Sequence, residues 1–133
     1  MIIDASVALP WLVQTPFSAD ARKLRTRSGC APAFLFVETA NVLLKYHRLT
    51  GVPLEEVEAG LRQLRDIVAD VTGDSELLPA AVRISAENSH KVYDCLYLAL
   101  ALERRAPLAT ADRKLAALAT KLSIETELIE PAL

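Results

Sequence analysis

Glycine is scarce in this sequence, which has four glycines among 133 residues. No stretch therefore has the glycine- and serine-rich composition of a flexible linker, and we find no internal repeat and no low-complexity segment. A chain of this length with 52% hydrophobic residues is long enough for one compact domain, which buries about two thirds of its unfolded surface. We therefore expect residues 1–133 to form a single domain.

Long hydrophobic runs and patterned cysteines are also missing. The longest uninterrupted apolar run, 95–102, has eight residues, whereas a membrane-spanning helix needs about 20. The N-terminal residues lack the basic and apolar regions of a secretory signal. Cys30 and Cys95 have no metal-ligand spacing and stand beside apolar residues, which favours two buried thiols in a reducing compartment. These absences predict a cytoplasmic protein without membrane contact, disulfide or structural zinc.

Charge of either sign is not in large excess. Seventeen acidic and 15 basic side chains give a formal net charge of −2. This balance argues against a module that holds nucleic acid on a large basic surface. It does not exclude an enzyme whose metal ions supply the positive charge. The basic run 22–27 and the side chains of Lys45 and Arg48 are candidates for phosphate contacts, with solvated helix faces as the simpler interpretation.

Short apolar runs alternate with helical patterns along the chain. Helix 93–105 is apolar almost all round and is expected to be central and buried. Pro10 and Pro79 are expected early in their helices, where the missing N–H matters least. The alternation predicts an α/β fold in which helices cover both faces of a parallel sheet. Strands are predicted at 1–3, 30–32, 69–72, 107–110 and 124–129, and helices at 7–13, 18–27, 33–49, 54–68, 78–87, 93–105 and 112–121.

Four acidic side chains stand in apolar surroundings. A carboxylate withdrawn from water costs several kcal/mol unless something pairs with it. Two of the four follow predicted strands, and the carboxyl ends of parallel strands line a common crevice, so these two are expected to lie close together. No basic side chain is clearly assigned to the four, which makes a shared divalent cation the economical partner. The four are Asp4, after 1–3; Glu38, within 34–44; Asp94, within 92–98; and Asp112, after 107–111.

Each of these carboxylates also has a purely structural explanation. Asp4 and Asp112 precede helical patterns, where aspartate is a favoured N-cap. Glu38 lies on a polar stripe of its helix, which is typical of a solvated face. Asp94 lies in the first turn of its helix, where the helix dipole stabilises an anion. The residues alone leave both explanations open.

A carboxylate cluster points to a particular chemistry. Oxygen ligands without thiolate or imidazole favour magnesium or manganese over zinc. Such a site suits displacement at phosphorus, because the metal activates water, screens the phosphate and stabilises the leaving oxygen. His47 and His90 are not spaced as metal ligands or as part of a nucleophilic triad, so neither is assigned a catalytic role. Trp11, Phe34 and Phe36 are expected in the core or an interface rather than as base-stacking platforms.

Four segments around these acids resemble the PIN domain, and the size and layout of the chain are similar to VapC-like ribonuclease toxins of toxin-antitoxin pairs. Each motif alone is weak, but their order and spacing together are fairly specific and extend over essentially the whole chain. The segments are IIDAS at 2–6, VETANVL at 37–43, YDCLYLALA at 93–101 and LATADRKL at 108–115.

The resemblance implies a three-layer α/β/α sandwich with a central parallel sheet. It implies a magnesium- or manganese-dependent endoribonuclease that cleaves RNA phosphodiester bonds with metal-activated water. The implied partners are the RNA substrate, a cognate antitoxin as inhibitor, and a second copy in a homodimer. The catalytic and metal-binding residues would be Asp4, Glu38, Asp94 and Asp112, and Ser6, Asn41 and Thr110 would orient them by hydrogen bonds.

One departure from the family pattern affects the metal count. Residues 113–116 contain no acid where some relatives carry one, so we expect one tightly held ion and treat a second as assisted by substrate. Two other interpretations remain. One is a catalytically silent PIN-like interaction module. The other is an aspartate-based phosphohydrolase, which is disfavoured because Ser6 stands where such enzymes carry a second aspartate.

Overall fold

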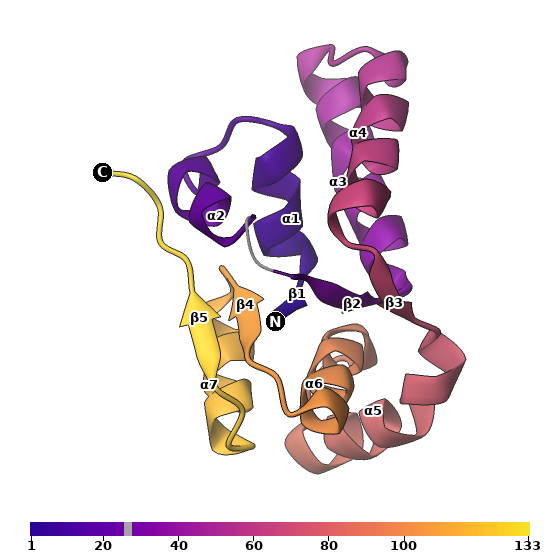
Figure 1. Cartoon of the computed structure of the whole chain (residues 1–133), viewed down its shortest axis with the longest axis vertical. Coiled ribbons are helices and arrows are strands. Elements are labelled where there is room, and N and C mark those ends of the chain that lie inside the picture. The colour runs from indigo at the N-terminus through magenta and orange to yellow at the C-terminus, as the bar shows by residue number, and fades with distance from the viewer. Residues whose placement is uncertain (26–27) are drawn as a thin grey trace.

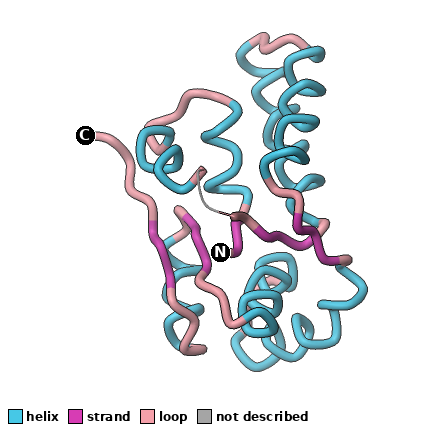
Figure 2. Tube along the Cα trace, in the orientation of Figure 1, coloured by secondary structure: helices cyan, strands magenta, loops and turns pink. Residues whose placement is uncertain are grey.

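The computed structural model, which describes residues 1–25 and 28–133, contains one sheet of five short parallel strands (Figures 1 and 2). The strand order is β3-β2-β1-β4-β5, and all four neighbouring pairs are parallel. The predicted parallel sheet is therefore confirmed. The strands are β1 (Ile2–Ile3), β2 (Cys30–Pro32), β3 (Asp70–Thr72), β4 (Leu108–Thr110) and β5 (Thr126–Leu128).

Helices cover both faces of this sheet, which makes the predicted three-layer α/β/α sandwich. Figure 1 shows α1 to α4 on one side of the strands and α5 to α7 on the other. Helices α3 and α4 form a long hairpin that extends beyond the sheet. The helices of the described residues are α1 (Ala5–Leu12), α2 (Ser18–Leu24), α3 (Phe34–Thr50), α4 (Leu54–Ile67), α5 (Asp74–Asn88), α6 (Val92–Arg104) and α7 (Arg113–Lys121).

Strand β1 lies at the centre of the sheet, where the direction of the strand order changes. From β1 the chain builds outward to β2 and β3, and then returns to add β4 and β5 on the other side of β1. The loops after β1 and β4 therefore leave the sheet in opposite directions and open a crevice at the carboxyl ends of these strands. Asp4 and Asp112 lie at these two ends.

Helix α6 is the central helix of the lower layer, as its apolar sequence predicts. Residues 94–101 are all buried, and α6 contacts β1, β2 and β4. A helix that is buried on nearly every side leaves its few polar groups without water. Any polar side chain among residues 94–101 therefore needs a partner inside the protein.

Both helix-proline predictions are wrong in detail. Helix α1 begins at Ala5 because Asp4 caps it, so Pro10 is the sixth of its eight residues. Helix α5 begins at Asp74, and Pro79 lies inside it. The acidic first turn of α5, which contains Asp74 and Glu76, favours this earlier start because of the helix dipole. Pro79 is exposed, so water reaches the carbonyl group that its ring leaves without a hydrogen bond.

Three further expectations concern cysteine, the second helix and membranes. Both cysteines are free, but only Cys95 is buried, because Cys30 lies at the start of β2 and remains partly exposed. Helix α2 ends at Leu24, and the basic run at 22–27 lies partly outside the described residues. Over residues 1–25 and 28–133, no helix combines the length and apolarity needed to span a membrane.

Candidate active site

Asp4 is a buried carboxylate at the junction of β1 and α1. Its Oδ1 accepts hydrogen bonds from the backbone N–H of Ser6 at 3.0 Å and from Ser6 Oγ at 2.6 Å. Its Oδ2 accepts a hydrogen bond from Thr110 Oγ1 at 2.5 Å. Burial raises the pKa of Asp4 to about 7, although these hydrogen bonds oppose the rise; the negative charge of Glu38 adds to it. Asp4 is thus an N-cap that also carries an electrostatic cost.

The same two hydroxyl groups join the ends of β1 and β4. Ser6 Oγ accepts a hydrogen bond from the backbone N–H of Ala111 at 2.7 Å, and Thr110 Oγ1 accepts one from the backbone N–H of Asp112 at 3.0 Å. The expectation that Asp4 and Asp112 lie close together is met through this network. The side chains of Ser6 and Thr110 therefore hold Asp4 and the backbone of Asp112 in fixed relative positions.

Asp112 caps helix α7 with one of its two carboxylate oxygens. Its Oδ1 accepts hydrogen bonds from the backbone N–H groups of Lys114 and Leu115 at 2.9 and 3.1 Å. Its Oδ2 accepts no hydrogen bond from any part of the chain that the structure describes. Asp112 and Asp94 line one hollow of about 290 Å³, whose other lining residues are Ser89, His90, Lys91 and Lys114.

Asp94 is buried in the first turn of α6, and it has basic neighbours that the sequence analysis did not assign. His90 Nε2 lies 2.8 Å from Asp94 Oδ2, and Lys91 Nζ lies 3.9 Å from the same oxygen. The expectation that no basic side chain is assigned to the acids is therefore wrong for Asp94. The four-residue spacing of His90 and Asp94 was the available signal. It was missed because His90 lies before the start of the helix.

Glu38 projects from α3 toward α6, where it meets Tyr97. Tyr97 Oη donates a hydrogen bond to Glu38 Oε1 at 2.7 Å, and the tyrosine is buried. Burial raises the pKa of Glu38; the hydrogen bond from Tyr97 opposes the rise, and the charge of Asp94 adds to it. Glu38 is half-buried, so a fully solvated face does not describe it.

Tyr97 is the hydrogen-bond partner of Glu38 and lies within electrostatic reach of Asp4 and Asp94. Burial raises the pKa of its hydroxyl, and the negative charges of Glu38, Asp4 and Asp94 raise it further. The hydroxyl consequently keeps its proton and serves as a donor. Tyr97 lies three residues after Asp94 on the same helical stripe, but only the tertiary structure brings Glu38 of α3 to it.

Three predicted site residues lie outside the group formed by the acids and their partners. Asn41, Lys45 and Arg48 are exposed on α3. None of them forms a hydrogen bond or ion pair with another residue that the structure describes. They extend away from Glu38 along the helix, so their predicted contacts with RNA or with the carboxylates stay predictions.

The donor chemistry of the four carboxylates fits a hard divalent cation. All the donors are oxygen atoms, as magnesium and manganese prefer. Burial and like charge raise the pKa values of Asp4 and Glu38, and a bound cation would lower both. Among the described residues, however, no three His, Cys, Asp or Glu side chains are arranged to hold an ion as they stand.

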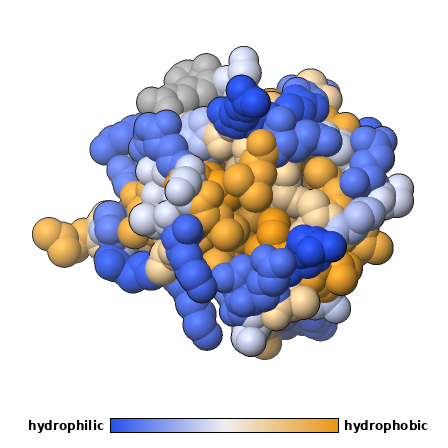
Figure 3. Space-filling model, turned by 90° about the horizontal axis from the view of Figure 1, so that it is seen from below, coloured by the Kyte–Doolittle hydropathy of each residue, from blue (hydrophilic) through white to orange (hydrophobic). Residues whose placement is uncertain are grey.

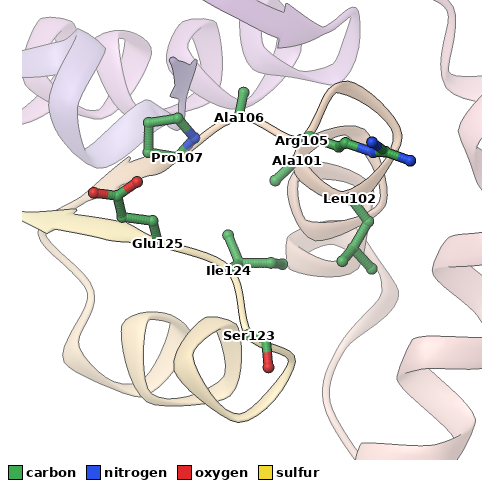
Figure 4. A pocket seen from close by; sticks show the side chains of 8 residues that line it. All are labelled: Ala101, Leu102, Arg105, Ala106, Pro107, Ser123, Ile124 and Glu125. Carbon is green, nitrogen blue, oxygen red and sulfur yellow. The ribbon is translucent and has the colours of Figure 1, made fainter.

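A second hollow of about 290 Å³ lies at the opposite edge of the sheet (Figure 4). Leu102 and Ile124 face it, and it lies beside the segments that lead into β4 and β5. Figure 3, which views the molecule from below, shows apolar residues in the middle of the face that carries α5, α6 and α7. Among the described residues that line this hollow, Glu125 is the only one with a carboxylate. None of the four acids lines this hollow, so the candidate site lies at the other edge of the sheet, where the strands have their carboxyl ends.

Replacement of Thr110 by valine tests the network around Asp4. Valine has nearly the same shape but leaves the buried Oδ2 of Asp4 without its donor and the backbone N–H of Asp112 without its acceptor. We expect Thr110→Val to lower the free energy of unfolding by about 1–3 kcal/mol, measured by urea unfolding at neutral pH. Thr120→Val is the matched control, because Thr120 is exposed and only donates to a carbonyl group of its own helix. Equal effects of the two variants would contradict a special role for Thr110.

Sequence comparison relates most of this chain to known proteins. The family model of the PIN domain matches residues 1–121. Ribonuclease VapC3 of Mycobacterium tuberculosis is 30% identical over 118 residues, which cover 87% of this chain and 85% of the relative.

Two solved structures share the fold. PAE2754 from Pyrobaculum aerophilum matches with a TM-score of 0.71 and 24% identity, over 88% of this chain and 77% of that one. A toxin-antitoxin complex from Klebsiella pneumoniae matches with a TM-score of 0.65 and 18% identity, over 85% of this chain and 87% of the matched chain. At these identities the structural matches establish the three-layer arrangement alone.

Proposed function

This chain belongs to the PIN-domain family, and on that premise we propose that it is a metal-dependent endoribonuclease that cleaves RNA phosphodiester bonds with a water molecule. The gathering of the acids at one edge of the sheet carries the proposal: Asp94 and Asp112 line one hollow, Thr110 donates a hydrogen bond to Asp4, and Tyr97, three residues after Asp94, donates one to Glu38. Asp112 joins them through the hydrogen bond of its backbone to Thr110. The name of the relative that is 30% identical, a ribonuclease, supports RNA as the substrate.

Buried like charges at one edge of the sheet are costly for a protein that does not use them. At effective dielectric constants between water and a dry interior, two such charges about 4 Å apart repel by about 4 kcal/mol. A silent interaction module would gain stability from a neutral side chain at Asp4, whose pKa is raised by burial. The presence of all four acids therefore favours an enzyme over a silent module.

The proposed ligands of the metal are Asp4, Glu38, Asp94 and Asp112. A magnesium or manganese ion supplies positive charge to the phosphate and activates a water for attack when it is bound. One tightly held ion is proposed, because residues 113–116 provide no further acid.

The chain itself contributes orientation and charge. Ser6 and Thr110 fix both oxygens of Asp4 by hydrogen bonds, and Tyr97 fixes Oε1 of Glu38. Such outer partners keep carboxylates in the orientation that binding requires. Lys91 and Lys114 line the hollow beside Asp94 and Asp112, where their ammonium groups can meet phosphate oxygens.

Partner proteins are proposed on the family resemblance. We infer a cognate antitoxin that acts as an inhibitor and a homodimer of this chain. The name of the structure from Klebsiella pneumoniae, a toxin-antitoxin complex, agrees with the first. The single-domain organisation of residues 1–133 and Asn41 as an orienting residue likewise stay proposals.

Metal-dependent cleavage of RNA is the direct test. Purified protein free of antitoxin is incubated with a panel of single-stranded and hairpin RNAs, with magnesium and then with EDTA in excess. We expect cleavage with magnesium and at least about a 100-fold lower rate with EDTA, because the ion activates the attacking water. Restoration of the rate by added manganese would support the same site. Cleavage that is unaffected by EDTA would contradict the proposal.

A further inference from the structure

We propose that Tyr93, backed by Phe34, is a stacking platform that receives an unpaired RNA base beside the carboxylates. This inference rests on the proposed function and deepens it. The two rings lie with centroids 5.3 Å apart and an interplanar angle of 13°, which is a stacked arrangement. Tyr93 is 55% exposed, whereas Phe34 is partly buried and packs against the core. One ring is thus anchored and supports the other at the surface.

The stack lies one helical turn from the carboxylate cluster. Phe34 and Glu38 are four residues apart on α3, and Tyr93 and Tyr97 are four residues apart on α6. Phe34 stacks on Tyr93, and Glu38 accepts a hydrogen bond from Tyr97, so the two contacts lie one turn apart on each helix. A turn rises about 5.4 Å, so the stack lies a short distance from Glu38. Tyr93 also directly precedes Asp94 in the chain.

The platform is fixed in position before any ligand arrives. Tyr93 lies in the first turn of α6, whose next residues are buried in the core. The backbone N–H of Phe34 donates to Asp74 Oδ1 at 3.0 Å, which holds the start of α3 against α5. A ring that is already oriented loses little conformational entropy when a base stacks on it.

The charges around the platform suit a polyanion. Lys91 lies two residues before Tyr93, is largely exposed, and lines the hollow that also contains Lys114. A nucleotide whose base lies on Tyr93 can therefore place an adjacent phosphate toward these lysines. A single ring face with lysines nearby fits a base joined to phosphates better than an amphipathic helix, which needs a continuous apolar groove.

The platform accounts for a preference for unpaired RNA rather than for one base. Every base has a face that stacks on an aromatic ring, so stacking tolerates different sequences. A base inside a duplex is already stacked and is not available. Tyr93 would thus select single-stranded or looped segments. Phe34 packs against the core, as the sequence predicts, and it also supports Tyr93 by stacking.

Binding of fluorescent RNA tests the platform apart from cleavage. The Asp4→Asn protein serves as the background, because it should leave RNA intact and its buried substitution does not reach Tyr93. A single 2-aminopurine is moved along a short unpaired RNA. We expect one position at which binding quenches its fluorescence. At that position, Tyr93→Leu should weaken binding about 5- to 100-fold, and Tyr93→Phe should keep it.

Two controls make the result specific. Tyr46→Leu removes a tyrosine from the same helix as Phe34, two turns beyond Glu38, and should leave binding unchanged. An abasic RNA at the quenched position should bind equally to the proteins with Tyr93 and with Tyr93→Leu. Absence of quenching at every position would overturn the proposal without any variant. The proposal would also be overturned if Tyr93→Leu weakened binding of intact and abasic RNA equally, or if it weakened only the binding of a protein partner.

The two proposals fail separately. If the unmodified protein cleaves RNA with magnesium but shows no dependence on Tyr93, the platform is wrong and the nuclease stands. If no RNA is cleaved but a stacked 2-aminopurine is found, the chain binds unpaired RNA without the proposed chemistry.

Discussion

Replacement of Asp94 by asparagine is expected to reduce magnesium-dependent RNA cleavage at least about 100-fold. The substitution keeps the shape of a buried side chain in the first turn of α6 but removes its charge. Loss of an outer partner of a metal ligand typically costs about 10- to 100-fold in activity or metal affinity. Asp94 is a proposed ligand itself, so its loss should cost at least as much. The measurement is the initial rate of cleavage of the best RNA in the panel.

Controls separate lost chemistry from lost folding. The amide that replaces the carboxylate retains an oxygen that can accept a hydrogen bond from His90, so we expect the Asp94→Asn protein to remain folded by circular dichroism. Asp66→Asn makes the same chemical change at an exposed position on α4 and should leave the rate unchanged. Cleavage by Asp94→Asn at the rate of the unmodified protein would indicate a contaminating nuclease and would remove the basis of the site assignment.

Metal-free protein is expected to lose stability as the pH rises toward 8, and Asp4 should be the main cause. Burial raises the pKa of Asp4 from 3.8 to about 7, so the folded chain keeps a proton that the unfolded chain has already released. Stability from this group is fully present below about pH 4 and is lost as the pH rises through 7. The difference between the two pKa values corresponds to about 4 kcal/mol.

Urea unfolding at about pH 5 and about pH 8 in EDTA measures this loss. Asp20 and Asp70 act in the opposite direction, because hydrogen bonds and neighbouring cations lower their pKa values, but both lie near the surface. The Asp4→Asn protein also contains Asp20 and Asp70, so subtracting its pH dependence removes the contribution of these two groups. We expect Asp4→Asn to be the more stable protein at the higher pH, by a few kcal/mol.

Magnesium should reverse the loss in the unmodified protein alone. A cation near Asp4 favours its charged form, so added magnesium is expected to stabilise the unmodified protein more at about pH 8 than at about pH 5. Asp4→Asn should respond much less. A metal-free protein whose stability is flat across this range, with no response to magnesium, would contradict both the buried charge and the metal site.

Prediction from the sequence worked where a local pattern has a single structural solution. The apolar run 95–102 has no polar face, and α6 is the buried central helix that it predicts. The alternation of short strands and helices produced the parallel sheet with two helical layers. The predicted helix starts were less accurate, because Asp4 and the acidic first turn of α5 begin their helices before the apolar pattern does.

The sequence singles out four acids as candidate site residues, but it does not show which side chains hold them. Asp4, Glu38, Asp94 and Asp112 stand out because carboxylates are costly in apolar segments. His90 was set aside, although it lies within hydrogen-bonding distance of Asp94. Spacing along the chain gives no information about which side chain faces another across helices.

The sequence by itself therefore determined the α/β class, the buried α6 and the four acidic positions, because each depends on local hydrophobic pattern and on the cost of burying charge. Only the tertiary structure decided the partners. Tyr97 reaches Glu38 across 59 residues, and Thr110 reaches Asp4 across 106. Such contacts exist only when separate helices and strands pack at one edge of the sheet. The same packing put Tyr93 on Phe34 beside the site, where the sequence alone shows two ordinary aromatic residues.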